Sequence, residues 1–582
     1  MRIVVGSSFE AGSALAHAIN TVKTAEGFAR LGHDVHLVCR RPASGALDEQ
    51  ALARVYGLSA RLRWHQVRPN LGARVLDAHW HFALQALPIV LALRPDLVFS
   101  RSFVLPSATA ALGIATISES HAWPDNASAP LARMVAGARR KAYRGLVTIA
   151  PTLAESFAAR GVPQEKILVL PDAVDLDLFA PKGARPRSQT DGVRRVVYAG
   201  HLYDYKGIPT VLAAAERLPA IRFELVGGLP DDVARCARIV SERGLGNVVL
   251  HGLKPLGAVP AHLWDADALI LPPSADHPSA AWTSPVKLGE YLAAQRPVVA
   301  SEIPALRHWL NDREAAFFAP DDPADCARVI SQVLDDPDYG QALAAAGARL
   351  APALAYERRA EAILAFAEDG TRPPDLSAQA RAAAAVARTK DAFAAAIARL
   401  GPGDIAVDCG ANVGEYTEAM ARTGATVHAF EPNPHAFAAL ERRVADLPNV
   451  HLHRAAVDAT AGTALLFQHV NAAEDPLYWS QGASLVSEKA NVDARNAVEV
   501  ETVDLAAFVE ALERPPALVK IDIEGAEGRV LDRLVASGLM AQLPAIFVET
   551  HERKIPALRP TLARLDLRRH RDFSDKLWLD WE

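Results

Sequence analysis

Four residues in the run SPVKLGEYLAAQRPVVAS, residues 284–301, could together hold a nucleotide diphosphate. A Ser-Pro pair, here Ser284 and Pro285, is a good helix start, and free backbone N–H groups at a helix N-terminus favour an anion. Lys287 and Glu290 follow in the first turns of the predicted helix. The ammonium group suits a phosphate, and the carboxylate can accept hydrogen bonds from both hydroxyls of a ribose. The alternative is an ordinary capped amphipathic helix.

A second run, which starts at Ile405 and includes DCGANVGEYT and FEPNP, predicts a strand, a glycine-rich turn, a helix, a strand and an acid. Gly410 and Gly414 let the backbone approach a ligand. Glu431 lies 23 residues after Asp408, the spacing that places a carboxylate on a ribose. A dinucleotide site is the rival interpretation, but GxGxxG is missing and Asp408 would repel a pyrophosphate. A cationic sulfonium cofactor fits these charges better.

The elements that must position these residues follow an α/β pattern. Short runs rich in Val, Ile and Leu alternate with helical stretches, as in parallel sheets covered by helices on both faces. The runs that we predict as strands are residues 2–5, 35–38, 96–100, 195–199, 222–226, 268–271, 297–300, 405–408, 426–430, 518–523 and 545–549. They fall into three groups, which predicts three α/β domains.

Two stretches separate these groups. Residues 181–192 are charged and carry Pro and Gly, as linkers do, and Pro373 and Pro374 cannot continue a helix. We therefore expect domains at 1–180 and 193–345, closing helices at 346–367, a linker at 368–377 and a third domain at 378–582. The third domain should begin with an Ala-rich helix over residues 378–400.

Bulk properties exclude several classes of protein. A chain of 582 residues is too long for one hydrophobic core, and its net charge of -6 gives no basic field for nucleic acid. The four cysteines lie far apart without histidine pairs at ligand spacing, so we expect neither a metal site nor disulfides. The start MRIVVGSS is unlike a signal peptide, and no apolar stretch is long enough to span a bilayer. We expect a cytoplasmic protein.

Residues 1 to about 367 resemble GT-B glycosyltransferases of the retaining family 4 type, which contain two Rossmann-like domains. The resemblance rests mainly on the 284–301 run. It implies that Glu290 binds the ribose of a nucleotide-diphosphate sugar, with Ser284, Pro285 and Lys287 at the same site. Many members carry an earlier glutamate where this chain has Trp282, so the identity of the donor sugar stays open.

The run AGHLYDYKG, residues 199–207, resembles the family segment in which a basic pair neutralises the pyrophosphate. Lys206 matches the lysine of that pair, and Gly200 lies in the same loop. His201 stands where many members have arginine, and a neutral imidazole supplies less charge. A solvated loop lysine is the alternative for Lys206.

The acceptor side is predicted in the first domain. ISESHAWPD, residues 117–125, places Glu119 and His121 after a predicted strand, and the resemblance matches His121 to a histidine that lines the acceptor cleft. The alternative for His121 is a structural role, and Asn20 and Lys23 are weaker candidates. The family needs no metal, because a helix N-terminus and basic groups stabilise the leaving diphosphate.

From Ala378 onward the chain resembles the FkbM family of methyltransferases that depend on S-adenosylmethionine (SAM). The motifs are DCGANVGEYT, FEPNP, RAAVDATAG, GASLV, VETVDLAAF and VKIDIEGAEGRVL. The fold implied is a Rossmann-like class I methyltransferase. The resemblance implies that SAM is held by Asp408, Gly410, Asn412, Gly414, Glu431 and Asn433. It also places Asp458 near the adenine, although a simple turn residue is an equal alternative.

Acids follow two strands of this domain. Asp522 and Glu524 lie at the carboxyl end of a predicted strand, where ligands bind in open α/β sheets, and Glu549 and His551 leave the next strand. They could orient or deprotonate a substrate hydroxyl, and His551 is the preferred base because the ordinary imidazole pKa lies near neutrality. The alternative is helix capping and ion pairing. FkbM relatives methylate hydroxyls, often on sugars.

The two resemblances together predict a glycosyltransferase fused to a SAM-dependent O-methyltransferase. The expected product is an O-methylated glycan or glycoside, such as a bacterial surface polysaccharide. One alternative is that both halves tailor a secondary metabolite, and another is that the first half only binds a nucleotide sugar. A predicted helical face with Arg133, Arg140 and Arg144 favours either a solvated surface or peripheral contact with the inner membrane surface.

Overall fold

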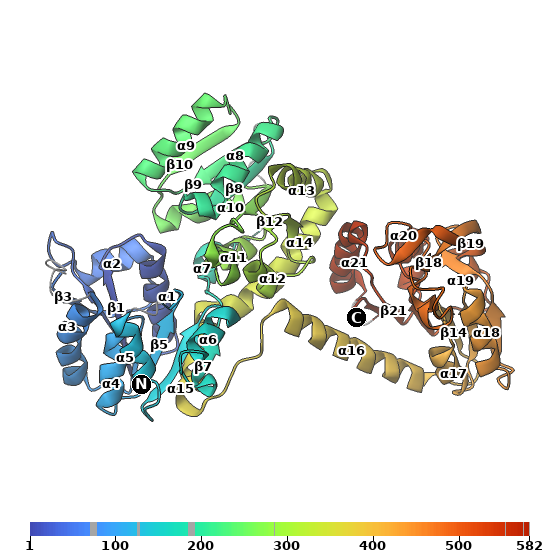
Figure 1. Ribbon diagram of the computed structural model, residues 1–582, viewed down its shortest axis with the longest axis horizontal. Coiled ribbons are helices and arrows are strands. Elements are labelled where there is room, and N and C mark those ends of the chain that lie inside the picture. Colours follow the sequence, from blue (N-terminus) through green and yellow to red (C-terminus); the bar gives the residue numbers. More distant parts are fainter. Residues whose placement is uncertain are drawn as a thin grey trace. The chain divides into compact units, whose positions relative to one another are not determined.

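The chain forms two compact units, Met1–Leu376 and Ser377–Glu582 (Figure 1). The computed structural model describes residues 1–69, 78–124, 128–183, 192–284, 286–552, 554–573 and 576–580. The first unit contains two parallel sheets, and the second contains one parallel sheet and a smaller mixed sheet. The expectation of three Rossmann-like α/β sheets is confirmed.

The first sheet has the strand order β3-β2-β1-β4-β5-β6-β7. The order reverses between β1 and β4, the kind of position at which open α/β sheets bind ligands. Its strands are Arg2–Glu10 (β1), Asp34–Arg40 (β2), Arg63–Val67 (β3), Leu97–Ser100 (β4), Thr116–Ser120 (β5), Tyr143–Thr148 (β6) and Ile167–Val169 (β7). Its helices are Ala16–Arg30 (α1), Glu49–Tyr56 (α2), Ala78–Leu93 (α3), Val104–Ala111 (α4), Ala129–Gly137 (α5), Pro151–Ala158 (α6), Gln164–Lys166 (η1) and Leu176–Phe179 (α7).

Helices cover both faces of this sheet, which explains its unbroken apolar strands. Ile3 of β1 packs with Phe28 of α1 on one face. Val4, the next residue, packs with Phe82 of α3 on the other face. Side chains that alternate along a strand therefore enter two separate cores.

The second sheet has the order β10-β9-β8-β11-β12-β13. Its strands are Arg195–Ala199 (β8), Arg222–Val226 (β9), Val248–Gly252 (β10), Ala268–Leu271 (β11), Val298–Ser301 (β12) and Ala316–Phe318 (β13). Its helices are Asp204–Lys206 (η2), Ile208–Arg217 (α8), Pro230–Glu242 (α9), Leu256–Ala258 (η3), Val259–Trp264 (α10), Pro278–Ala281 (η4), Val286–Ala293 (α11), Pro304–Trp309 (α12), Pro323–Asp335 (α13), Pro337–Leu350 (α14) and Ala351–Leu354 (η5). Asp322 and Asp336 cap α13 and α14 through their carboxylates, as N-cap residues do.

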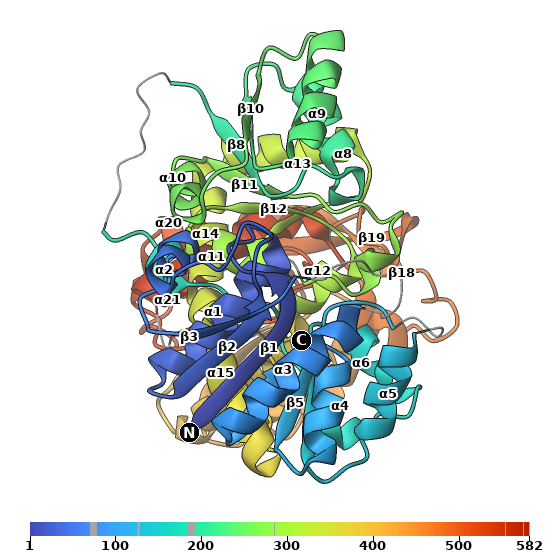
Figure 2. The same ribbon diagram turned by 90° about the vertical axis from the view of Figure 1, so that its left-hand side faces the viewer.

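Helix α15 (Tyr356–Asp369) follows the second sheet in the chain but packs on the first (Figure 2). Ala360, Ile363 and Phe366 enter the core that contains Phe28 of α1. The helix ends at Gly370, which has φ +85°. By burying this apolar face, α15 fastens the two sheets of the first unit to each other.

The second unit begins with the expected Ala-rich helix, Ala378–Arg399 (α16), whose N-cap is Ser377. Its main sheet is parallel with the order β16-β15-β14-β20-β21-β22. The strands are Ile405–Cys409 (β14), Thr426–Phe430 (β15), Val450–His453 (β16), Leu518–Ile521 (β20), Ile546–Val548 (β21) and Leu577–Trp578 (β22). The helices are Glu415–Ala421 (α17), Pro434–Arg443 (α18), Tyr478–Gly482 (η6), Leu505–Glu510 (α19), Glu527–Ala536 (α20), Leu539–Ala541 (η7), Pro556–Leu558 (η8) and Arg559–Asp572 (α21).

A small sheet with the order β17-β19-β18 lies in the same unit. It consists of Ala456–Asp458 (β17), Gly462–His469 (β18) and Val492–Asp504 (β19). Strand β19 pairs parallel with β17 and antiparallel with β18. The sequence patterns did not predict this sheet, because its long strands are only partly buried and lack a continuous apolar run.

The prediction of a helical face that carries three arginines is wrong. Helix α5 ends at Gly137, and Arg144 lies in strand β6, so Arg133, Arg140 and Arg144 do not share one helical face. Arg133 instead lies over the ring of Trp80, 5.0 Å from its centroid. Among the residues that the structure describes, no helix has the length and apolar character needed to cross a membrane.

Candidate functional sites

Two lysines meet after the carboxyl end of β8 in the second sheet. Lys287 of α11 donates a hydrogen bond to the Tyr198 hydroxyl at 2.7 Å and lies 4.1 Å from the centroid of that ring. Burial lowers the pKa of Lys287 far below its ordinary value, and nearby Lys206 lowers it further. Burial also lowers the pKa of Lys206. In the described part of the chain neither lysine forms an ion pair, so both amino groups are left to bind an anion, which would favour their charged forms.

Gly200 makes room for Lys287. Its backbone has φ +142°, and a Cβ atom there would lie 2.3 Å from Cε of Lys287. His201 follows, stacked on Tyr203 with a centroid distance of 5.1 Å. Burial and Lys287 lower the pKa of His201, and its Nδ1 atom is buried without a hydrogen-bond partner among the described residues. The imidazole is therefore neutral and adds no charge to the two lysines.

The carboxylate and hydroxyl of the 284–301 run lie beside these two lysines. Burial raises the pKa of Glu290 to about 7, although Lys287 opposes the shift. Ser284 is buried, and its hydroxyl accepts a hydrogen bond from the backbone N–H of Asp172 at 2.9 Å. Pro285 lies outside the described residues. The residues predicted to bind the nucleotide sugar, apart from Pro285, thus lie close together at one edge of the second sheet.

His121 lies at the matching edge of the first sheet. Its Nε2 atom bonds to Glu119, and its Nδ1 atom lies 3.6 Å from Asp172 Oδ1. Glu119 is buried, and its second oxygen binds Arg359 of α15 at 3.1 Å. Although burial opposes ionisation, Arg359 and His121 hold the pKa of Glu119 far below its usual value. Glu119 is therefore ionised and fixes the orientation of His121.

Asn20 and Lys23, the weaker candidates for the acceptor side, are buried in the interior of the first domain. Lys23 is 2% exposed and pairs with Glu26 at 2.8 Å and Asp175 at 2.7 Å. Asn20 is 1% exposed and donates a hydrogen bond to Asp172. Lys23 has a structural role, and Asn20 orients the aspartate beside His121.

Two tryptophans from the two sheets of the first unit meet near these sites. Trp123 follows β5 and is 45% exposed, and Trp282 lies between η4 and α11. Their ring centroids are 4.9 Å apart. Trp282 stands where the resembled family often has a glutamate, so an aromatic surface replaces a carboxylate beside the donor helix.

The second unit contains a cavity of about 590 Å³ at the carboxyl edge of its main sheet. Gly410, Asn412, Glu431 and Asn433, which the family resemblance assigns to SAM binding, line it. Glu431 accepts hydrogen bonds from the backbone N–H groups of Asn412 at 2.9 Å and Asn433 at 2.8 Å, and burial raises its pKa to about 7. Gly410 has φ +79°, and a Cβ there would lie 1.7 Å from the carbonyl oxygen of Asp522.

Asp408 is a correction to the expected SAM site. It is fully buried, accepts a hydrogen bond from Thr417 at 2.6 Å and pairs with Lys520 at 3.2 Å. It does not line the cavity. Its charge is therefore neutralised inside the protein and is not presented to a ligand. Asp408 supports the turn from behind through Lys520, which donates to the carbonyl of Gly410 at 3.1 Å.

Gly414 and Asp458 also lie away from the cavity lining. Gly414 is the N-cap of α17 with φ +87°. Asp458 forms a bidentate ion pair with Arg529, with one contact at 3.0 Å. The structural alternative therefore accounts for Asp458, and Gly414 shapes the turn.

Acids and cations share the other end of the cavity, which Asp522, Glu524 and Glu549 line. His551 lies 3.2 Å from Glu524 and 2.8 Å from Glu527. Burial disfavours its charged ring, but these two acids raise the pKa of His551 to about 11. A protonated ring cannot accept a proton, so the arrangement favours the alternative of ion pairing with Glu524 and Glu527 over the predicted role of His551 as base.

Glu524 is held from two sides. Burial opposes its ionisation, but His551 and Lys489 lower the pKa of Glu524 to about 2. Its backbone has φ +55°, a strained value for a residue with a side chain and one that often marks functional sites. Asp522 differs, because burial raises its pKa even though Lys520 lies 3.4 Å away. Burial thus favours the protonated form of Asp522, in contrast to Glu524.

Family models match three consecutive parts of the chain. Residues 20–178 match Glycosyltransferase Family 4, residues 193–336 match Glycosyl transferases group 1, and residues 408–573 match the Methyltransferase FkbM domain. The chain carries family 4 glycosyltransferase domains followed by an FkbM methyltransferase domain. Both family resemblances seen in the sequence are confirmed.

Curated relatives match the glycosyltransferase domains in part. WcaL of Escherichia coli (strain K12), named as a colanic acid biosynthesis glycosyltransferase, is 27% identical over 169 residues, which are 28% of this chain and 41% of WcaL. A D-inositol 3-phosphate glycosyltransferase of Paenarthrobacter aurescens (strain TC1) is 26% identical over 245 residues, 39% of this chain and 57% of the relative. The chain spans about half the length of the curated relatives it matches.

Solved structures share the fold of the glycosyltransferase domains. Sucrose-phosphate synthase from Thermosynechococcus elongatus has a TM-score of 0.51 and 19% identity, covering 63% of this chain and 98% of that chain. Anabaena HepE, in complex with UDP, has a TM-score of 0.50 and 15% identity, covering 63% and 100%. The GT-B fold is confirmed.

Three residues at these sites were missed from the sequence. Asp172 lies between the two sheets of the glycosyltransferase and contacts Ser284, Asn20 and His121. In the FkbM domain Lys489 holds Glu524, and Lys520 joins Asp408 to Asp522. The position of Lys520 inside the otherwise apolar strand Leu518–Ile521 could have indicated its role from the sequence. Nothing local distinguished Asp172 or Lys489 from surface residues.

Proposed function

We propose that the chain transfers a sugar from a nucleoside-diphosphate donor to a glycan or glycoside acceptor and uses SAM to methylate a hydroxyl of that product. One observation carries the proposal. At the carboxyl edge of its sheet, the glycosyltransferase holds two half-buried lysines that form no ion pair among the described residues, and the FkbM domain holds a cavity in whose lining acids outnumber lysines. Each site thus has the charge opposite to that of its proposed ligand.

In the glycosyltransferase, Lys206 and Lys287 bind the diphosphate, and Glu290 accepts hydrogen bonds from the ribose hydroxyls. UDP in the HepE complex supports a uridine diphosphate sugar as donor. During retaining transfer the bond from the anomeric carbon to the diphosphate breaks, and the acceptor oxygen bonds to that carbon on the same face. The acceptor proton passes to the leaving diphosphate, whose charge the lysines stabilise.

His121 belongs to the acceptor side of this reaction. Glu119 and Asp172 lie beside its two ring nitrogens, so the ring has one favoured orientation. It orients the acceptor hydroxyl toward the sugar, and positioning of this kind supplies much of the rate in group transfer. A glycosyltransferase that only binds nucleotide sugar would not require this arrangement.

In the FkbM domain, Glu431 accepts hydrogen bonds from the ribose of SAM, and Gly410 lets the backbone approach the cofactor. SAM, when bound, supplies the methyl group. Asp522 takes the proton of the substrate hydroxyl, since burial has raised its pKa. The protonated His551 and Lys489 hold Glu524 ionised beside it, where the negative charge favours a sulfonium.

The relatives favour two kinds of acceptor. The name of WcaL supports a surface polysaccharide, and the names of the D-inositol 3-phosphate glycosyltransferases support a small glycoside. We place the polysaccharide first, because sugar O-methylation and glycosyl transfer then act on one growing glycan. The enzyme would work at the cytoplasmic side, where nucleotide sugars and SAM are both available.

The experiment incubates the full chain with methyl-labelled SAM, a panel of nucleotide sugars, and either a glycan extract or small polyol acceptors. Mass spectrometry should show a product that has gained one sugar and one labelled methyl group. Glu290→Ala should remove the sugar gain, and Glu431→Gln should remove the methyl gain alone. Hydrolysis or binding of nucleotide sugar without transfer to any acceptor would overturn the proposed glycosyltransferase activity.

A further inference from the structure

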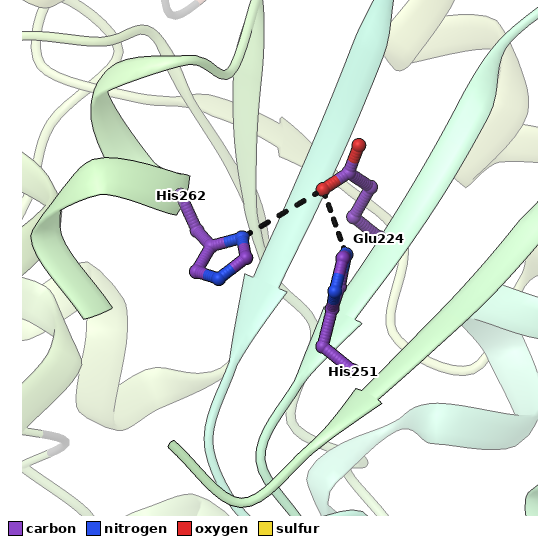
Figure 3. Close-up of side chains that lie close together, drawn as sticks. All are labelled: Glu224, His251 and His262. Carbon is purple, nitrogen blue, oxygen red and sulfur yellow. Dashed lines mark hydrogen bonds and ion pairs between the residues drawn. The ribbon is translucent and has the colours of Figure 1, made fainter. Parts of the chain in front are cut away.

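A group of one acid and two histidines lies on the second sheet and belongs to neither site described above. Glu224 is in the middle of β9, His251 is near the end of the edge strand β10, and His262 is in α10 (Figure 3). Figure 3 shows both rings directed at the carboxylate of Glu224. Among the described residues, no hydrogen bond or ion pair joins this group to the two lysines of the donor site.

The backbone directs His251 toward its partners. The register between β9 and β10 shifts at this point, since Leu250 pairs with Leu225 but Gly252 pairs with Val226. His251 is the extra residue of that irregularity, and β-bulges of this kind redirect a side chain. Helix α10 supplies His262 and is anchored by Leu263, which is fully buried in the core of this domain.

The three side chains have the spacing of metal ligands. Glu224 Oε2 lies 2.9 Å from His251 Nε2 and 3.9 Å from His262 Nδ1, and one ligand atom of each residue lies within 4.8 Å of the others. Tetrahedral zinc with bonds of about 2.0–2.2 Å separates its ligands by roughly 3.3–3.5 Å. Small side-chain movements therefore suffice for binding. The side chains are 13–24% exposed, which leaves a path for an ion.

The charges around the group also fit. The ring nitrogens of His251 and His262 can serve as metal ligands together with a carboxylate oxygen of Glu224. Arg195 lies 3.5 Å from the other oxygen, Oε1, of Glu224 and so orients Oε2 toward the two imidazoles. Two imidazoles and one carboxylate are a donor set that zinc accepts with one position left for water.

We propose that Glu224, His251 and His262 bind a divalent transition-metal ion, for which Zn²⁺ is the best match. Bound there, the ion would join β9, the edge strand β10 and α10, and so would stabilise the outer side of the donor domain. The proposed site is structural and takes no part in sugar transfer. It does not depend on the proposed function, because it rests only on the geometry of these three residues.

The test uses the full chain, without an affinity tag and stripped of metal by a chelator. ZnCl₂ is titrated by calorimetry, and CoCl₂ is added while the visible spectrum is recorded. We expect Zn²⁺ to bind and raise the melting temperature, and Co²⁺ to give the intense bands of a tetrahedral site. Glu224→Gln and His262→Gln should each weaken Zn²⁺ binding at least about tenfold and remove these bands.

His435→Gln is the matched control, because His435 is exposed and lies outside the group. It should leave zinc affinity and the Co²⁺ spectrum unchanged. Circular dichroism verifies that each variant is folded. If His262→Gln does not fold, the test relies on Glu224→Gln, because glutamine has nearly the same shape as glutamate. A wild-type chain that binds no Zn²⁺ would overturn the proposal. Bands that survive in the folded variants would do so too, because the ion would then lie elsewhere, for example at Asp522, Glu524 and His551.

Discussion

Lys287 illustrates a conflict between binding and stability. Its partial burial and the nearby Lys206 disfavour the ammonium form in the free protein, and a bound anion favours that form. We predict that Lys287→Met, which keeps the length of the side chain, raises the melting temperature of the free protein. The same change should weaken UDP binding roughly 10- to 100-fold, since hydrogen bonds to charged groups contribute about 1.5–3 kcal/mol. Scanning calorimetry and titration calorimetry measure the two effects.

Lys141→Met is the control for this variant, because Lys141 is exposed on the first domain. It should change neither the melting temperature nor the affinity for UDP. A Lys287→Met protein that melts earlier and binds UDP normally would show that Lys287 is a structural residue.

If Glu431 binds the ribose of SAM as proposed, SAM binding should depend on pH. Burial raises its pKa in the free protein to about 7, and ribose hydroxyls donate more strongly to the ionised carboxylate. The ligand therefore prefers the state present above pH 7. We predict that SAM affinity falls as the pH decreases below about 7, by up to roughly tenfold per pH unit, and levels off above it. Titration calorimetry between about pH 5.5 and 8.5 measures this.

Glu431→Gln should bind SAM weakly at every pH, since the amide does not ionise in this range. Glu441→Gln, a change of an exposed acid on α18, should keep the wild-type profile. If affinity were independent of pH in the wild type, the assignment of Glu431 to the ribose would be wrong.

The elements that sequence patterns predicted best are those buried on both faces. The expected strands at Arg195–Ala199, Arg222–Val226 and Ala268–Leu271 have the same bounds in the structure, because continuous apolar runs have few alternatives to a central parallel strand. Strands β18 and β19 were missed, since their exposed residues interrupt any apolar run. The prediction of one helical face with Arg133, Arg140 and Arg144 was wrong for the opposite reason. The spacing of these charges fits a helix, but the helix ends at Gly137.

Which residues become neighbours in the sites depends on which strands pair. Local sequence patterns do not reveal this pairing. Asp408 and Lys520 are neighbours because β14 pairs with β20 in a register that places them opposite each other. Only that pairing shows that the charge of Asp408 is neutralised, and that Glu431 and the acids after β20 and β21 face the cavity. His551 is similar, because its protonation follows from Glu524 and Glu527, which arrive from another loop and helix.

The turn between β14 and α17 provides a prediction for the FkbM domain. In Gly410→Ala the new methyl group would meet the Asp522 carbonyl at 1.7 Å, and φ +79° is strained for alanine. The turn and the loop after β20 must then separate. We predict loss of SAM binding and methyl transfer, with sugar transfer unchanged because the glycosyltransferase is a separate unit.

Gly401→Ala is a suitable control for this turn. Gly401 lies in the loop before β14, and no described atom beyond its chain neighbours lies within 4 Å of the position that an alanine methyl group would take there. It is also not among the glycines with positive φ. SAM binding should therefore be kept. A Gly410→Ala protein that binds SAM like the wild type would contradict the close approach of the two loops.

The whole chain consists of units that bury their cores separately. Helix α15 closes the glycosyltransferase, and Arg372 binds the backbone carbonyl of Ile167 at 2.8 Å, which holds the start of the connecting segment on the first unit. Helix α16 then begins at Ala378 in the second unit. We predict that residues 377–582 fold alone and bind SAM with the affinity of the full chain. Circular dichroism and calorimetry test this, and a folded fragment without SAM affinity would count against it.

Fusion of the two activities is useful only if they share a product. A short connection gives each unit a local concentration of the intermediate that can reach the millimolar range. The order of the steps can be tested with variants that each disable one ligand site. Glu431→Gln is preferable to a change of Asp408, whose loss would remove one of the two carboxylates that pair with the buried Lys520. We predict that Glu431→Gln protein makes an unmethylated glycoside, which Glu290→Ala protein then methylates.

A further experiment tests whether the two units act in sequence on one product. It gives the same acceptor to the wild-type chain and to the Glu431→Gln and Glu290→Ala variants. Wild-type chain should form the methylated glycoside faster than an equimolar mixture of the two variants, because in the mixture the intermediate must diffuse between molecules. Equal rates would mean that the intermediate is released before methylation, so that fusion only fixes the ratio of the two enzymes. Mass spectrometry of the products over time separates these outcomes. If Glu290→Ala protein methylates the original acceptor but not the glycoside, methylation precedes sugar transfer and the predicted order is reversed.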